Sequence, residues 1–268
     1  MPEIPEMETY KILLNKSVKG KKIMQVAVKR HKTVNIPAIE FINKVRGRII
    51  EEIDRRAKYL IFRLKDGNYL LAHMMLDGRL KLASDQEEVK AQVIFSLEDG
   101  HNLNFCDMRL GYLNYHTPDQ LQQELIELGV EPLSEEFTWP LFQEILKGRR
   151  GAIKSMLMDQ KIIAGIGNAY SNEILFAASL LPDRKIPRLT EQERSNLFEV
   201  IPRILRNAIA EGGYIETPFA DWDNQSGGML DKFKVYDREG EQCLVCGKII
   251  KKKQIGGRNA FYCHVCQR

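Results

Sequence analysis

The chain has 268 residues and a mass of 30.9 kDa, with 44% hydrophobic and 28% charged residues. This composition is typical of a soluble globular protein and excludes a mainly disordered chain. No apolar run reaches the roughly 18 residues that a membrane helix needs, and no basic start followed by an apolar stretch predicts a secretory signal. We therefore expect a cytoplasmic protein that does not contact membranes.

The first half of the chain is predicted to be rich in strands. A helix is expected from Glu3 to about Ser17, because acidic residues near its start favour the positive end of the helix dipole. Short strand-like runs follow, and Asp-Gly pairs between them mark hairpin turns. The predicted strands are Lys22–Lys29, Arg48–Asp54, Tyr59–Leu64, Tyr69–His73, Ala91–Leu97 and Asn102–Cys106. Short strands at this spacing predict a β-sandwich or a barrel.

The second half is predicted to be helical and changes character near Gly129, where a linker-like segment ends in a helix cap. The predicted helices are Trp139–Leu146, Ala152–Met158, Ala169–Ala178 and Glu191–Ala210. A glycine-rich polar stretch follows, and a short cysteine-rich module ends the chain. The fold class expected from this order of elements is α+β.

Four of the five cysteines lie in two Cys-x-x-Cys pairs near the C-terminus: Cys243, Cys246, Cys263 and Cys266. Two such pairs, 16 residues apart, are the pattern of a zinc ribbon, in which four thiolates complete a tetrahedron around one structural zinc. Free thiols and a redox pair are the less favoured alternatives. His264 is not needed as a ligand, and Cys106 is expected to be a free thiol.

The positive charge of the chain is concentrated around this module. The whole chain has 40 basic and 36 acidic residues, but the last 26 residues contain six basic residues and no acidic one. This end of the chain is therefore predicted to bind a polyanion. Arg258 is the best candidate for a phosphate contact, because its planar guanidinium can donate to two oxygens at once.

The N-terminus has two interpretations. A proline and several acids at a helix start are common without any catalytic role. Alternatively, removal of Met1 exposes the secondary amine of Pro2, and an α-amino group has a pKa near 8, about two units below that of lysine. A neutral amine can attack an electrophilic carbon and form a Schiff base, and Glu3 stands beside it as an acid.

Motifs along the whole chain, in the same order, resemble bacterial formamidopyrimidine-DNA glycosylases. The matching segments are Pro2–Thr9, Arg55–Leu60, Leu128–Ser134, Ala152–Lys154, Gly165–Tyr170, Val235–Tyr236 and the four cysteines with Arg258. The resemblance implies an N-terminal β-sandwich with flanking helices, a helical domain with a helix–two-turn–helix, and a zinc-ribbon hairpin. The corresponding domains would be residues 1–130, 131–222 and 223–268.

The resemblance also implies the chemistry. Pro2 would attack C1′ of a damaged nucleotide, Glu3 would donate and shuttle protons, and Lys58 would act as a basic group near the reacting phosphate. Glu6 matches a further, supporting acid. Elimination from the Schiff base would then nick the strand, so a bifunctional glycosylase and lyase is expected.

The implied partner is double-stranded DNA that contains a damaged base, bound by a monomer in the bacterial cytoplasm and nucleoid. Lys154 and Asn168 would bind phosphates next to the damage, together with Arg258 of the zinc hairpin. Because a stacked base is inaccessible, the nucleotide must flip out. Leu76 would then wedge into the stack, and Arg109 would pair with the orphaned base.

The sequence departs from the family pattern in the loop that carries the void-filling aromatic. The segment Asp107–Tyr112 is one residue shorter than the family motif and has no phenylalanine, and Leu76 replaces a methionine. The expected substrates are oxidised purines such as 8-oxoguanine and formamidopyrimidine. The alternatives are a paralogue acting on alkylated bases or oxidised pyrimidines, and a non-catalytic protein that binds damaged DNA.

Overall fold

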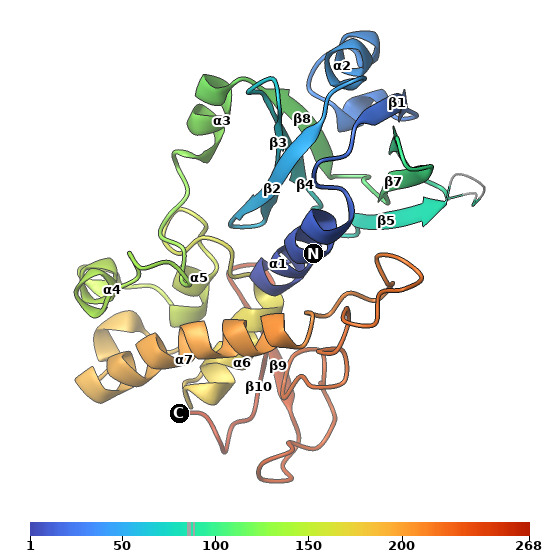
Figure 1. Cartoon of the computed structure of the whole chain (residues 1–268). Coiled ribbons are helices and arrows are strands. Elements are labelled where there is room, and N and C mark those ends of the chain that lie inside the picture. The colour runs from blue at the N-terminus through green and yellow to red at the C-terminus, as the bar shows by residue number, and fades with distance from the viewer. Residues whose placement is uncertain (85–86, 88) are drawn as a thin grey trace. The chain divides into compact units, whose positions relative to one another are not determined.

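The computed structural model describes residues 1–84, 87 and 89–268 (Figure 1). The chain forms two compact units, one made of residues 1–127 and 212–228, the other of residues 128–211 and 229–268. The polar stretch after residue 211 thus returns to the first unit. The predicted division into three domains, with bounds after residues 130 and 222, stays a prediction.

The first unit contains two four-stranded antiparallel sheets, in the strand orders β1-β6-β7-β5 and β2-β3-β4-β8. The strands are β1 Ile23–Val28, β2 Ile50–Arg56, β3 Tyr59–Leu64, β4 Tyr69–His73, β5 Arg79–Ser84, β6 Val93–Leu97, β7 His101–Cys106 and β8 Tyr112–His116. The rings of Phe62 and Phe105, one from each sheet, lie 6.0 Å apart in a shared apolar core. The predicted sandwich is confirmed.

Two strands of the sandwich, β5 and β8, had no strand prediction. In β5 the residues facing away from the core include Arg79 and Lys81, and β8 is only five residues long. Both strands form because they pair with β7 and β4, whose sequences predict strands. Pairing in the tertiary structure therefore decides what local propensity leaves open.

Three helices flank the sheets: α1 Ile4–Ser17, α2 Ala38–Val45 and α3 Pro118–Leu125. Helix α1 begins where the acidic pattern predicts it. Glu3 and Glu6 form a reciprocal capping box, in which the Glu3 N–H donates to Glu6 Oε2 at 2.8 Å. Met7, Tyr10 and Leu14 bury the other face of the helix in the core. The cap fixes the start of the chain beside the sandwich.

Asparagine side chains cover both edges of the second sheet. Asn15 of α1 donates to the Ile53 carbonyl at 2.7 Å and accepts from the Ile53 N–H at 3.1 Å. Asn35 does the same for Tyr115 on the opposite edge, with both bonds at 2.9 Å. Edge strands with unpaired backbone groups invite pairing with other chains. The two amides satisfy those groups at one position on each edge.

The second unit contains helices and one hairpin. Its elements are α4 Trp139–Leu146, α5 Ile153–Leu157, α6 Asn168–Ala177, α7 Glu191–Ala210, β9 Lys251–Ile255 and β10 Arg258–Tyr262. Short 3₁₀ turns occur at residues 186–188 here and at residues 31–33 in the first unit. All four predicted helices are present, although α5 is only five residues long. Among the described helices, none is long and apolar enough to cross a membrane.

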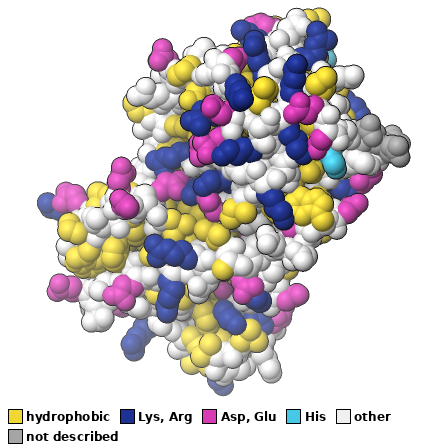
Figure 2. Space-filling model, in the orientation of Figure 1, with side chains coloured by type: hydrophobic (Ala, Val, Ile, Leu, Met, Phe, Trp, Pro, Cys, Tyr) yellow, Lys and Arg dark blue, Asp and Glu magenta, His cyan; other side chains and the backbone are white. Residues whose placement is uncertain are grey.

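Charged side chains of both signs are mixed over the face of the molecule in Figure 2, and hydrophobic side chains gather over α4. The net charge of the chain is +4, but the basic side chains on this face do not form one continuous positive patch. A surface that binds a polyanion must be located from individual residues.

Candidate active site and zinc centre

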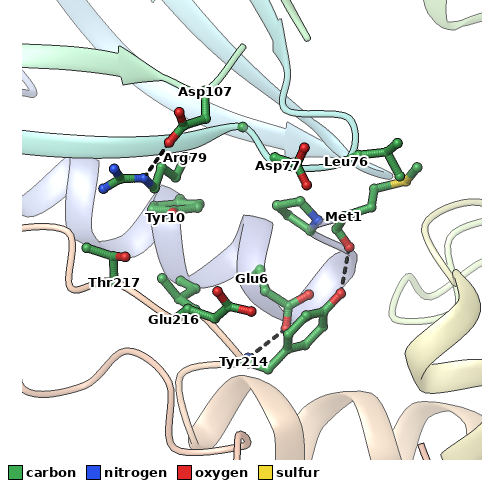
Figure 3. A pocket seen from close by; sticks show the side chains of 13 residues that line it. Met1, Glu6, Tyr10, Leu76, Asp77, Arg79, Asp107, Tyr214, Glu216 and Thr217 are labelled. Atoms are coloured by element: carbon green, nitrogen blue, oxygen red, sulfur yellow. Dashed lines mark hydrogen bonds and ion pairs between the residues drawn. The ribbon is translucent and has the colours of Figure 1, made fainter. Parts of the chain in front are cut away.

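A cavity of about 280 Å³ lies beside the N-terminus, within the first unit (Figure 3). Its walls come from the start of α1, the turn after β4, the end of β7 and residues 214–217. The lining residues are Met1, Pro2, Glu6, Tyr10, Leu76, Asp77, Gly78, Arg79, Asp107, Tyr214, Ile215, Glu216 and Thr217. Pro2 and Leu76, which the sequence singled out separately, therefore face one cavity.

Glu6 fastens the N-terminus to the segment that returns from the second unit. Its Oε1 accepts from the Tyr214 N–H at 3.0 Å, while its Oε2 accepts from the Glu3 N–H. The Tyr214 hydroxyl donates to the Met1 carbonyl at 2.7 Å (Figure 3). Gly213 has a φ of +65°, and an added Cβ would lie 2.5 Å from Glu6 Oε1, so only glycine fits here. Glu6 thus positions Pro2 and Glu3.

Lys58 lies at the tip of the β2–β3 hairpin and is 8% exposed. Arg55 ties this tip to α1, because its Nε donates to Glu8 Oε2 at 2.7 Å and its Nη1 donates to the Ala57 carbonyl at 3.1 Å. Burial opposes ionisation of Glu8, but the bonds from Arg55 and Lys11 prevail and lower its pKa. The structure therefore links the hairpin of Lys58 to the helix that starts after Glu3.

His73 supports the turn that carries Leu76. Its Nδ1 accepts from the Met75 N–H at 3.1 Å, and its ring lies 4.7 Å from that of Tyr59. Burial and the charge of Lys58 lower the pKa of His73 to about 4, so the imidazole is neutral at physiological pH and keeps this acceptor. The sequence predicts no role for His73, because a lone histidine at a strand end carries no distinguishing signal.

The two divergent loops meet at a second cavity of about 320 Å³. Leu76, Asp77, Asp107, Arg109 and Leu110 line it. Leu76 is 49% exposed and Leu110 is 61% exposed. Large apolar side chains with this exposure at the rim of a cavity are available to enter a base stack, which is the role predicted for Leu76.

Met108 holds the two loops together beneath these exposed side chains. It is fully buried, its N–H donates to Gln92 and its carbonyl accepts from Arg30. A Cβ added at Gly78 or at Gly111 would lie 3.0 Å from the Met108 sulfur. The shortened loop is thus a tightly packed turn.

Lys154 is buried, whereas the resemblance predicts that it contacts a phosphate. It is 0% exposed. Its Nζ donates to Ser171 Oγ at 2.7 Å, to Asn172 Oδ1 at 3.1 Å and to the Asn168 carbonyl at 3.4 Å. The sequence could not separate a solvated lysine from a buried one. Its ammonium organises the start of α6.

Asn168 opens α6, directly after Gly165-Ile166-Gly167. It is partly exposed, and its buried Oδ1 has no hydrogen-bond partner among the described residues. Gly167 is the N-cap of this helix, so Asn168 lies at the positive end of the helix dipole. The placement is compatible with the predicted phosphate contact.

Asn172 and Glu173 dock the cysteine module on α6. Asn172 Oδ1, which also accepts from Lys154, accepts from the Phe261 N–H at 3.0 Å. The Glu173 carboxylate accepts from the backbone N–H groups of residues 234, 235 and 236, each at 2.9 Å. Neither residue was predicted, because buried polar groups in a helix are recognisable only from their partners.

The four predicted ligands Cys243, Cys246, Cys263 and Cys266 meet in one cluster, in which all four sulfurs lie within 4.8 Å of one another. A tetrahedral zinc at about 2.3 Å from each sulfur needs sulfurs roughly 3.8 Å apart. The Cys243–Cys266 and Cys246–Cys263 distances are 3.8 and 3.4 Å. The cluster therefore fits one structural zinc.

Arg258 begins β10 and is exposed. The hairpin turns through Gly256 and Gly257, both with positive φ, as a two-residue turn requires. A Cβ at Gly256 would lie 3.1 Å from the hydroxyl of Ser155 on α5. The tip of the hairpin is thus packed beside α5 in the second unit, and Arg258 projects from a fixed support.

Three family models match consecutive parts of the chain. They are the formamidopyrimidine-DNA glycosylase N-terminal domain over residues 1–113, its H2TH domain over residues 128–219, and the zinc finger found in FPG and IleRS over residues 240–268. The chain belongs to the formamidopyrimidine-DNA glycosylase family.

Comparison with individual relatives supports this membership of the formamidopyrimidine-DNA glycosylase family. The chain is 37% identical to the formamidopyrimidine-DNA glycosylase of Pelotomaculum thermopropionicum, over all of this chain and 99% of that protein. It is 36% identical to the Listeria monocytogenes serotype 4b protein over the full length of both.

Two solved Lactococcus lactis Fpg structures are also similar. One is the wild-type protein in complex with DNA that contains N7-benzyl-Fapy-dG, with a TM-score of 0.92, 31% identity and full coverage of both chains. The other is a complex with DNA that contains an abasic site, with a TM-score of 0.91, 30% identity and 99% coverage of both.

Proposed function

We propose that this chain excises oxidised and ring-opened purines from double-stranded DNA through a Schiff base on Pro2, and then nicks the abasic site by elimination. The observation that carries the proposal is the cavity beside Pro2, held in place by Glu6 and bordered by the turn of Leu76. The relatives are formamidopyrimidine-DNA glycosylases, and a solved neighbour binds DNA that contains a Fapy-dG lesion, so both favour damaged purines over the alternative lesion classes.

The proposed chemistry divides between three residues. Pro2 follows Met1, so its nitrogen becomes a nucleophilic amine only after Met1 is removed. Glu3 is 2% exposed at the start of α1, where it donates a proton to the leaving side and later accepts one. Lys58, on the hairpin tied to α1, stabilises negative charge at the neighbouring phosphate. The enzyme acts where the DNA is, in the cytoplasm and nucleoid.

The proposal is tested with a panel of duplexes that each contain one lesion. The panel holds formamidopyrimidine, 8-oxoguanine, an alkylated purine, an oxidised pyrimidine and an abasic site. Excision of a purine lesion followed by a nick is the expected result. Tight binding without any excision would instead support a damage-binding protein, and excision restricted to pyrimidines would support the paralogue.

Among purine lesions, 8-oxoguanine paired with cytosine is expected to be a weak substrate. This pair is well stacked, and unstacking costs a few kcal/mol per step, which wedge side chains offset in part. Leu76 and Leu110 are the exposed apolar side chains at the two loops, and neither is as large as phenylalanine. Formamidopyrimidine and abasic sites should react faster under single-turnover conditions.

Inserting a phenylalanine between Leu110 and Gly111 should raise excision of 8-oxoguanine more than cleavage of an abasic site. If the unaltered chain removes 8-oxoguanine opposite cytosine at least as fast as every other lesion, the short loop does not limit the reaction.

Replacing Arg258 with alanine should weaken binding to all duplexes alike. A residue that contacts a phosphate adds about 0.9 to the slope of log affinity against log salt. The variant should therefore lower this slope by about one, as measured by fluorescence anisotropy at several salt concentrations. A loss confined to one lesion or one sequence would assign Arg258 to base recognition instead.

The Lys154→Met variant distinguishes a buried support from a phosphate contact. Loss of the ammonium removes the buried bonds from Nζ to Ser171 Oγ and to Asn172 Oδ1, although Asn172 Oδ1 keeps the bond from the Phe261 N–H. This loss should destabilise the chain by about 1–3 kcal/mol. The salt slope measured as for Arg258→Ala should stay unchanged, because no phosphate contact is removed. If the variant lowers the salt slope by about one, the result would instead support the direct phosphate contact predicted from the sequence.

A further inference from the structure

An ion pair joins the two loops that border the second cavity. Asp77 Oδ2 and Arg109 Nη2 lie 3.0 Å apart. Asp77 directly follows Leu76, and Leu110 directly follows Arg109, so each member of the pair is next in sequence to one of the exposed leucines that line this cavity. The Arg109 side chain is 80% exposed and that of Asp77 is 57% exposed.

Hydrogen bonds hold the backbone beneath this pair, so the side chain of Arg109 is the part left to be oriented. Met108 is buried and bonded through both its N–H and its carbonyl. The neighbouring Asp107 accepts from Arg79 Nε at 2.8 Å. A long arginine side chain on such a support still samples many rotamers, and a partner at the guanidinium reduces that freedom.

An acidic residue is unfavourable at a surface that approaches DNA. A carboxylate near phosphates opposes the counterion-driven affinity that basic residues supply. Asp77 is therefore expected to lower the affinity for DNA, and its presence here calls for another contribution to the complex. Among the residues that the structure describes, Asp77 contacts this guanidinium through Nη2, which leaves its other nitrogens to donate to a base.

We propose that Asp77 is a positioning residue that fixes the guanidinium of Arg109 and thereby sets which base is accepted opposite the lesion. The inference rests on the proposed function, in which Arg109 meets the orphaned base. A guanidinium held at Nη2 offers its remaining donors in one direction, and a base whose acceptors match that direction is favoured. A mobile guanidinium adapts to several bases.

The experiment measures single-turnover excision of formamidopyrimidine from four duplexes that differ only in the opposing base. Saturating enzyme removes differences in affinity from the comparison. In Asp77→Ala, the ratio between the fastest and slowest duplex should fall about twofold to fivefold, because an exposed ion pair can supply an effect of that size and a mobile guanidinium loses part of a well-oriented base contact. Asp77→Asn keeps the shape of the side chain but loses its charge. Its opposing-base ratio should lie between those of the unaltered chain and Asp77→Ala.

A double-mutant cycle tests whether Asp77 acts through Arg109. Arg109→Ala alone should remove most of the discrimination, and adding Asp77→Ala should then change nothing further. Additive effects, or an unchanged ratio in Asp77→Ala, would overturn the inference. Glu40→Ala is the matched control, because Glu40 is the exposed acid of another ion pair, with Lys44, and should leave the ratio unchanged.

The same variants separate this inference from the proposed function. Asp77→Ala should still form a borohydride-trapped complex with an abasic duplex, because the pair is exposed and contributes little to stability. Failure of the unaltered chain to trap would reject the proposed function. Normal trapping with unchanged opposing-base ratios would reject only the role of Asp77.

Discussion

We expect that blocking the amine of Pro2 abolishes Schiff-base formation. With Met1 removed, borohydride should trap the chain on an abasic duplex, and mass spectrometry should place the adduct on residue 2. A retained Met1 turns the nitrogen of Pro2 into an amide, which is not nucleophilic. The loss should be essentially complete, because a blocked N-terminus leaves no neutral amine of the kind proposed to attack C1′.

A Glu3→Gln variant serves as the matched control for this experiment. It keeps the amine and the hydrogen-bonding shape of residue 3 but removes the proton donor, so it should bind damaged duplexes and fail to excise the base. If a blocked N-terminus traps as well as the free amine, the nucleophile is a lysine. Lys58 would be the first candidate, because it lies on the hairpin that Arg55 ties to α1.

Replacing Cys263 with serine should release the zinc and eliminate DNA binding. Zinc binding supplies folding free energy to a small module, so losing one thiolate removes much of what holds the hairpin. Arg258 then loses its fixed support, even though Asn172 and Glu173 remain on α6. Elemental analysis should fall from one zinc per chain to none, and binding to all duplexes should be lost.

The first unit should survive this substitution, because its core contains none of the cysteine ligands. Limited proteolysis should leave a protected fragment of the first unit, with its strand content intact by circular dichroism. His264→Ala is the control that should keep its zinc, since His264 is exposed and lies outside the ligand cluster. Absence of stoichiometric zinc in the unaltered chain would contradict the assignment of the four cysteines.

Features that depend on local spacing or on the chemistry of single residues were predictable from the amino-acid sequence. The paired cysteines predicted the cluster because two Cys-x-x-Cys pairs leave little freedom for any other use. The acids after Pro2 predicted the start of α1, since capping is local. Strands such as Tyr59–Leu64 were predictable because their apolar runs are bounded by turn residues.

Which residues act together was not predictable, because it depends on contacts between segments that are far apart in the sequence. Lys154 reads as a surface base in the sequence, yet its ammonium is buried against α6, because burial depends on residues 14 to 18 positions away. Glu6 meets Tyr214 across 208 residues. Asp77 and Arg109 join two loops that no local pattern connects. Periodicity and motifs report on short-range geometry, whereas hydrogen bonds and ion pairs between distant segments exist only once the core has brought those segments together.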